Sequence, residues 1–182
     1  MEQAVRKIAL LGMGTVGGGV YEIIEKQKEE MPFKIGAALE VVKVLVRNKA
    51  KYADRIPAEK LTDVWEDVIG DDSIDIVVEV MGGIEPARTY IKAALEKGKH
   101  VVTANKDLMA MHGHELLELA GENHCDLLFE AAVAGGIPII RPLKQCLAGN
   151  NITEIMGIIN GTTNFILTKM KEDGMDFGEA LQ

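Results

Sequence analysis

Residues 7–19, KIALLGMGTVGGG, decide the fold of this chain. Four consecutive apolar residues lead into Gly12, Gly14 and Gly17, which have G-x-G-x-x-G spacing. Apolar residues then recur at helical intervals as far as Ile24. A strand, a tight glycine turn and a helix in this order are the context in which the motif predicts dinucleotide binding.

Each glycine of the motif has a separate physical reason. Gly12 permits a sharp turn out of the strand, Gly14 lets the backbone approach a pyrophosphate, and Gly17 lets the helix pack close to the sheet. The amides at the start of the helix, at the positive end of its dipole, then face the phosphates. The alternative is a turn that merely joins a buried strand to a helix. The position near the N-terminus and the strand–turn–helix context favour cofactor binding.

The composition is typical of a soluble globular protein. The 182 residues are 47% hydrophobic and 26% charged, which suits one domain, or one domain and part of another. A formal charge of −8 argues against nucleic-acid binding. No apolar run has membrane-spanning length, and the two cysteines form neither a metal-type pair nor a disulfide framework. We therefore expect a cytoplasmic protein that contacts neither membrane nor nucleic acid.

Strands and helices are predicted to alternate through the first 132 residues. This alternation indicates right-handed crossovers and a doubly wound parallel sheet of the Rossmann type, with residues 1–132 as the NAD(P)-binding domain. The predicted strands after the first are 39–46, 74–81, 100–104 and 127–132, and the predicted helices are 16–28, 65–69, 86–97 and 115–123.

The pattern changes after Ala132. A glycine-rich hinge precedes a predicted helix at 138–147, a strand at 152–159 and a helix at 162–171. Residues 133–182 are about fifty residues, too few for a comfortable second core. We interpret them as the truncated start of a second, α+β domain.

The end of the second predicted strand bears on the choice of nucleotide. In this fold an acidic residue there usually binds the ribose hydroxyls of NAD, whereas arginine accommodates the 2′-phosphate of NADP. Here the strand is followed by Arg47 and Lys49, with no carboxylate at its tip. These residues favour NADP, with NAD use left open. Ordinary surface bases after a strand are the equally weighted alternative.

Three further segments carry candidate chemistry. Lys106 follows the fourth strand, where a cation can bond the nicotinamide or a substrate oxygen, although a solvated lysine explains it as well. Glu130 begins a glycine-rich turn whose carboxyl and carbonyl oxygens suit a hard cation, or it pairs with a base at a hinge. The amides of Gly161 and Thr162 start a helix and can receive a substrate carboxylate, unless Asn160 or Thr162 simply caps that helix.

Four segments together resemble homoserine dehydrogenase: GMGTVGGGV at 12–20, TANK at 103–106, EAAVAGGIPII at 130–140 and GIINGTTNFIL at 157–167. They occur in the family's order and cover essentially the whole chain. The resemblance implies NAD(P)-dependent interconversion of aspartate 4-semialdehyde and homoserine, small-molecule substrates of threonine, methionine and isoleucine biosynthesis. It also implies a homodimer for the full-length enzyme, of which this chain would be the N-terminal portion, with residues 133–182 as the incomplete start of the substrate and dimerisation domain.

The resemblance assigns roles to residues at each segment. Those that would hold the pyrophosphate are Gly12, Gly14, Thr15, Val16 and Gly17, and Arg47 with Lys49 would hold the 2′-phosphate. Thr103 and Lys106 would lie beside the nicotinamide, which makes Lys106 the catalytic candidate of this chain. A monovalent cation, usually sodium, would be bound by Glu130 and the carbonyls of Val133, Gly135 and Ile137. Gly161 and Thr162 would border the substrate.

The family's other catalytic residues, an acidic pair and a proton-donating lysine, would lie beyond Gln182. We therefore expect a fragment that binds the cofactor but is inactive alone. Two alternatives remain open at this point. One is a different amino-acid semialdehyde dehydrogenase, such as aspartate semialdehyde dehydrogenase, which needs a nucleophilic cysteine that neither Cys125 nor Cys146 resembles. The other is a non-enzymatic dinucleotide-binding or redox-sensing module.

Overall fold

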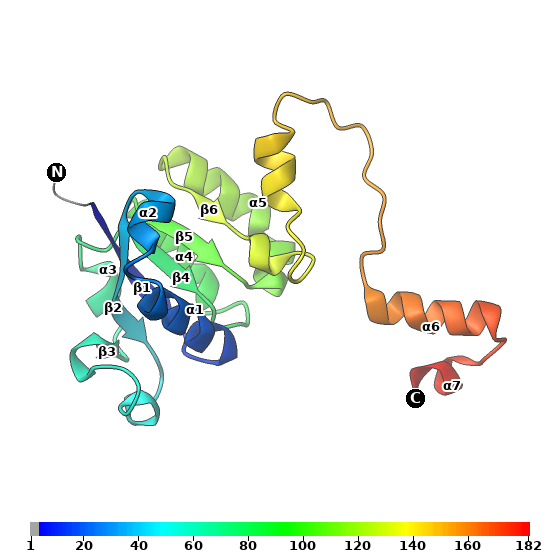
Figure 1. The fold of residues 1–182 in the computed structure, drawn as a ribbon, viewed down its shortest axis with the longest axis horizontal. Coiled ribbons are helices and arrows are strands. Elements are labelled where there is room, and N and C mark those ends of the chain that lie inside the picture. The colour runs from blue at the N-terminus through cyan, green and yellow to red at the C-terminus, as the bar shows by residue number, and fades with distance from the viewer. Residues whose placement is uncertain (1–3) are drawn as a thin grey trace. The chain divides into compact units, whose positions relative to one another are not determined.

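The computed structural model describes residues 4–182. Its contacts divide the chain into two compact units, the first ending at Ile140 and the second spanning Arg141–Gln182. The strands of the first unit are β1 (Val5–Leu11), β2 (Ala38–Leu45), β3 (Leu61–Thr62), β4 (Ile76–Glu79), β5 (His100–Thr103) and β6 (Leu127–Leu128). They form one parallel sheet in the order β3-β2-β1-β4-β5-β6 (Figure 1). This confirms the predicted doubly wound Rossmann sheet.

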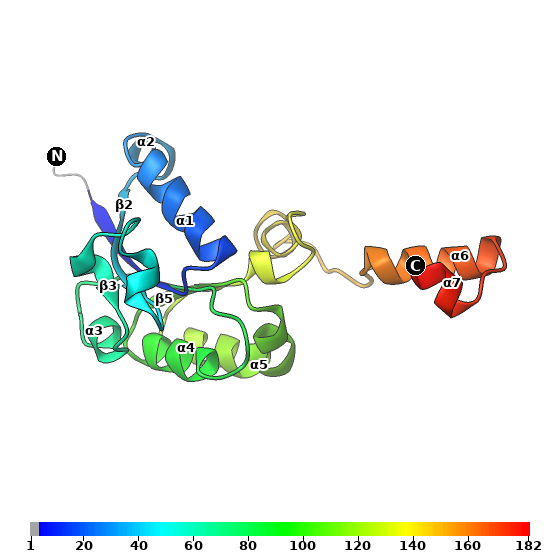
Figure 2. The ribbon, with the colours of Figure 1, turned by 90° about the horizontal axis from the view of Figure 1, so that it is seen from below.

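Helices cover both faces of the sheet, with α1 and α2 on one side and α4 and α5 on the other (Figure 2). The α-helices of this unit are α1 (Thr15–Lys26), α2 (Met31–Ile35), α3 (Glu66–Ile69), α4 (Ala87–Glu96) and α5 (Lys106–Glu122). The buried residues form two hydrophobic clusters, and alternate residues of β1 belong to one cluster or the other. Leu10 packs in the cluster that contains Ile24 of α1, whereas Leu11 packs with Leu95 of α4 and Leu116 of α5. A strand buried on both faces explains the unbroken apolar run before Gly12.

One helix is longer than the sequence predicted. The helix expected at 115–123 begins instead at Lys106, because Asn105 caps it and its side-chain oxygen accepts a hydrogen bond from the Leu108 amide at 3.1 Å. Residues 54–63 contain a 3₁₀ turn, η2 (Ala58–Lys60), and the short edge strand β3.

The second unit consists of helical segments joined by irregular chain. These are a π-helical turn, η4 (Pro142–Cys146), and the helices α6 (Gly161–Glu172) and α7 (Phe177–Leu181). The predicted strand at 152–159 is wrong, since these residues form no strand in the structure. A strand needs a hydrogen-bonded neighbour for its backbone, and the described residues of this unit supply none.

The compact units divide after Ile140 rather than after Ala132, where the sequence placed the boundary. Glu130 begins a 3₁₀ turn, η3 (Glu130–Ala132), and one of its carboxyl oxygens accepts hydrogen bonds from the amides of Ile139 at 2.6 Å and Ile140 at 2.9 Å. These bonds hold residues 133–140 to the first unit. Across residues 4–182, every helix is too short or too polar to cross a membrane.

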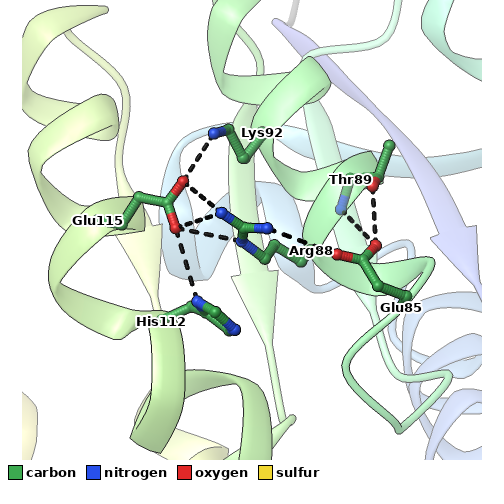
Figure 3. A network of polar contacts seen from close by, with 6 residues as sticks. All are labelled: Glu85, Arg88, Thr89, Lys92, His112 and Glu115. Carbon is green, nitrogen blue, oxygen red and sulfur yellow. Dashed lines mark hydrogen bonds and ion pairs between the residues drawn. The ribbon is translucent and has the colours of Figure 1, made fainter.

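A charged network joins α4 to α5 (Figure 3). Glu115 of α5 accepts hydrogen bonds from Arg88 at 2.8 and 2.9 Å and from Lys92 at 2.6 Å. Arg88 also lies 3.7 Å from Glu85, whose carboxyl group accepts a hydrogen bond from the Thr89 hydroxyl. The bonds from Lys92 and Arg88 lower the pKa of Glu115 to about 2. The two helices are thus joined by charges that persist at any pH near neutrality.

Candidate functional site

A cleft of about 520 Å³ lies at the carboxyl ends of the central strands. In the sheet, β1 lies between β2 and β4. The chain passes from β1 to β2 on one side and later returns to β4 on the other side of β1. Open α/β sheets bind ligands at such a switch point. The lining includes Gly12 and Gly14 after β1, Arg47 after β2, and Met81 and Gly82 after β4. The structure therefore brings the predicted glycine turn and Arg47 to one cleft.

Close backbone contacts explain the glycines of this turn. Gly12 has φ of 97°, and a Cβ atom there would lie 2.9 Å from the carbonyl oxygen of Val80. A Cβ atom on Gly17 would lie only 2.2 Å from the carbonyl oxygen of Gly12. A side chain at either position would push the first turn of α1 away from the ends of β1 and β4. These contacts support the sequence-based roles of both glycines.

The start of α1 presents backbone donors. Gly14 is the N-cap residue, and no described side chain caps this end or places an acidic group in the first turn. The first amides of an α-helix have no partner within the helix, which here applies to Thr15, Val16 and Gly17. A Cβ atom on Gly14 would meet nothing within 4 Å, so the space before the helix is open. Open space, unpaired amides and the helix dipole fit a pyrophosphate.

The two bases predicted to bind a 2′-phosphate have different surroundings. Arg47 lines the cleft, and so does Lys51. Lys49 instead forms an ion pair with Asp63 at 2.7 Å, and its hydrogen bond lowers the pKa of the Asp63 carboxyl group. Asp63 itself lines the cleft. Two carboxylates therefore line the cleft, Asp63 and Glu85, and Lys49 neutralises Asp63.

Thr103 and Lys106, both predicted to lie beside the nicotinamide, also have different surroundings in the structure. Thr103 is 1% exposed, and its hydroxyl group donates a hydrogen bond of 2.6 Å to Glu79. Lys106 starts α5 and lines a second hollow of about 730 Å³, formed mainly by α5 and by residues near Phe129 and Val133. The Thr103 side chain is therefore committed to the protein interior, while Lys106 remains at the surface.

The turn after Glu130 is irregular, as expected. Ala134 and Gly135 both adopt left-handed conformations, with φ of 57° and 61°. The turn is closed by hydrogen bonds from the Val133 amide to the Glu130 carbonyl and from the Ile137 amide to the Ala134 carbonyl. Residues 4–182 contain no cluster of three or more His, Cys, Asp or Glu side chains suited to a metal ion. A site built from one carboxyl group and carbonyls is of a different kind, and the cation stays a prediction.

Gly161 and Thr162 form the first turn of α6 in the second unit. Asn160 caps this helix, and its side-chain oxygen accepts a hydrogen bond of 2.8 Å from the Thr163 amide. Of the two residues that could cap this helix, Asn160 is therefore the one that does so. A role for Gly161 and Thr162 beside the substrate stays a prediction.

Sequence reasoning missed Glu79. It ends β4 and is 0% exposed, in contact with both Thr103 and the loop after β4. One signal was available, because Glu79 is the acidic residue within an otherwise apolar strand end that leads directly into Gly82 and Gly83.

Two family descriptions match the chain. "Homoserine dehydrogenase, NAD binding domain" matches residues 12–130, and "Homoserine dehydrogenase" matches residues 138–182. A homoserine dehydrogenase of Bacillus subtilis is 49% identical over 177 residues, which are 97% of this chain and 41% of the relative. One from Mycobacterium tuberculosis is 49% identical over 175 residues, or 96% and 39% of the two chains. The chain thus spans about two fifths of the length of the curated relatives it matches.

Solved structures agree with these matches. A homoserine dehydrogenase from Thiobacillus denitrificans superimposes with a TM-score of 0.83 at 45% identity, covering 98% of this chain and 42% of that one. A hyperthermophilic archaeal homoserine dehydrogenase in complex with NADPH gives a TM-score of 0.77 at 31% identity, covering 97% and 59%.

Proposed function

The chain belongs to the homoserine dehydrogenase family, and from this premise we propose that it binds NADP(H) for the interconversion of aspartate 4-semialdehyde and homoserine. The observation that carries the proposal is the turn at the switch point, where Gly12 and Gly17 make close backbone contacts and α1 presents uncapped amides. The family match favours this function over the aspartate semialdehyde dehydrogenase alternative.

The preference for NADP rests on charge. Arg47 lines the cleft, and a guanidinium group binds phosphate with a planar set of donors. Asp63 is the carboxylate that we compare with the acid that selects NAD in this fold. The ion pair with Lys49 reduces the repulsion between Asp63 and a 2′-phosphate. NADPH is also the cofactor bound by the archaeal relative. In this proposal Lys49 therefore favours the 2′-phosphate indirectly, by neutralising Asp63. Lys51 is the second base, with Arg47, that would contact the phosphate.

The remaining parts of the proposal concern the reacting end. The cofactor supplies hydride exchange between its nicotinamide and the carbon that bears the substrate oxygen. Lys106, at the start of α5, is proposed to bond the nicotinamide or that oxygen. The sodium site at Glu130, Val133, Gly135 and Ile137, the substrate contacts of Gly161 and Thr162, a homodimer and a cytoplasmic location rest on the family resemblance.

Replacing Arg47 with alanine is expected to weaken NADPH binding about tenfold to 100-fold and to leave NADH binding nearly unchanged. A hydrogen bond to a charged group contributes about 1.5–3 kcal/mol, and only NADPH carries the 2′-phosphate. Calorimetric titration of both cofactors measures the difference. Arg6→Ala is the matched control, because Arg6 lies in β1 and pairs with Asp75 before β4, at the opposite ends of these strands. Equal losses for the two cofactors would contradict the assignment.

A further inference from the structure

A network of buried hydrogen bonds connects the ends of β4 and β5. Glu79 is 0% exposed, Thr103 1% and Asn105 6%. One carboxyl oxygen of Glu79 accepts hydrogen bonds from the amides of Met81 at 2.8 Å and Gly82 at 3.3 Å, and the other accepts the Thr103 hydroxyl at 2.6 Å. The carboxyl group therefore joins the loop after β4 to the end of β5.

The same network continues into the start of α5. The hydroxyl oxygen of Thr103 accepts a hydrogen bond from the Asn105 amide at 3.0 Å. The Asn105 side chain donates to the carbonyl of Gly83 at 2.6 Å and accepts from the amide of Leu108 at 3.1 Å. Asn105 thus ties the loop after β4 to the first turn of α5, directly beside Lys106.

The loop that Glu79 holds is in contact with the glycine turn. Met81 and Gly82 line the cleft. The carbonyl oxygen of Val80 and the Cα atom of Met81 lie 2.9 and 3.1 Å from the position of a Cβ atom on Gly12. A displacement of this loop would therefore change the wall on which the turn rests and the shape of the cleft.

We infer that Glu79 is a positioning residue for the nicotinamide cofactor. Its carboxyl group holds the loop after β4 against the glycine turn, and through Thr103 and Asn105 it fixes the corner from which Lys106 extends. A buried carboxyl group costs stability unless it is hydrogen-bonded, and here three donors meet it. The inference rests on the proposed function, since it assigns the loop to the cofactor cleft.

Substitutions at Glu79 test the inference. Glu79→Ala leaves two amides and a hydroxyl group without their acceptor, so the loop is expected to rearrange. NADPH binding is expected to weaken about 100-fold, which is roughly the contribution of one hydrogen bond to the charged cofactor. Glu79→Gln is expected to bind within about tenfold of wild type, because its oxygen can accept the two amides and its nitrogen can donate to Thr103. The readouts are calorimetric affinity and the fluorescence of bound NADPH, at a temperature where circular dichroism shows each variant folded.

Lys99→Met is the matched control. Lys99 is 3% exposed, and its ammonium group donates to the carbonyls of Asp71 at 2.7 Å and Ile74 at 3.0 Å, at the opposite ends of β4 and β5. It is expected to lower the melting temperature and leave NADPH affinity unchanged. An equal loss of affinity in Lys99→Met would show that general destabilisation explains the effect, and would overturn the inference.

Two further outcomes separate this inference from the proposed function. Tight binding of NADPH by wild type and by Glu79→Ala alike would overturn the inference alone, whereas failure of wild type to bind would overturn both. Thr103→Val, which exchanges the hydroxyl group for a methyl group of similar size, keeps the test decisive if Glu79→Ala does not fold. It is expected to weaken NADPH binding about tenfold, and unchanged binding in that variant would contradict the inference.

Discussion

Replacing Gly17 with alanine is expected to weaken NADPH binding by at least about 100-fold, because each lost hydrogen bond to the charged pyrophosphate contributes about 1.5–3 kcal/mol. The added Cβ atom would lie 2.2 Å from the carbonyl oxygen of Gly12, and both atoms belong to backbone. Since no side chain can move aside to relieve the contact, α1 must shift away from the turn. Its amides then no longer point to the pyrophosphate position. Calorimetric titration with NADPH measures the loss.

Gly19→Ala provides the comparison within the same helix. A Cβ atom at Gly19 would meet nothing within 4 Å. Alanine there is expected to keep the affinity of wild type and to stabilise the fold by about 0.5–1 kcal/mol, because glycine loses more backbone entropy in a helix. If Gly17→Ala bound NADPH as tightly as Gly19→Ala, the close approach of α1 to the turn would have no role in binding.

A polypeptide of residues 1–182 is expected to bind NADPH and yet to oxidise homoserine at least about 10⁴-fold more slowly than a full-length relative. It matches 41% of the length of the Bacillus subtilis enzyme, and the family resemblance places a proton-donating lysine and an acidic pair outside the matched part. Positioning of the substrate supplies about 7–11 kcal/mol of a lowered barrier. A proton donor adds about 10²–10⁴-fold.

The assay follows reduction of NADP⁺ by homoserine, with the full-length Bacillus subtilis enzyme measured beside this polypeptide. NADPH affinity, measured on the same preparation, shows that an inactive sample is still folded and competent to bind. Turnover within tenfold of the full-length enzyme would mean that Lys106 and its neighbours suffice for the chemistry, and the placement of the proton donor would be wrong.

The sheet and its switch point were predictable because they depend on local patterns. The apolar run before Gly12 and the glycine spacing predict the β1–turn–α1 unit, and the alternation of strands and helices predicts the parallel order. The start of α5 was harder to predict, because its N-cap residue, Asn105, follows the end of β5 almost directly. The strand predicted at 152–159 failed because β propensity is local, whereas a strand requires a partner.

The details of the candidate site depend on contacts between distant residues. Lys49 and Arg47 are nearly adjacent in sequence, but Lys49 pairs with Asp63, which follows β3. Glu79 and Thr103 are 24 residues apart and meet because β4 and β5 are neighbours in the sheet. A one-dimensional pattern shows that a residue is polar and where it lies on its strand. It does not show which partner uses that polar group.

The most direct test of the central claim, that the glycine turn at the switch point binds the nicotinamide dinucleotide, is a titration of ¹⁵N-labelled protein with NADPH followed by NMR. We predict saturable shifts of the backbone amides of Gly12, Gly14 and Val16, together with those of Met81 and Gly82 across the cleft. Shifts confined to the α5 hollow that includes Lys106 would contradict the claim, and so would the absence of any saturable shift.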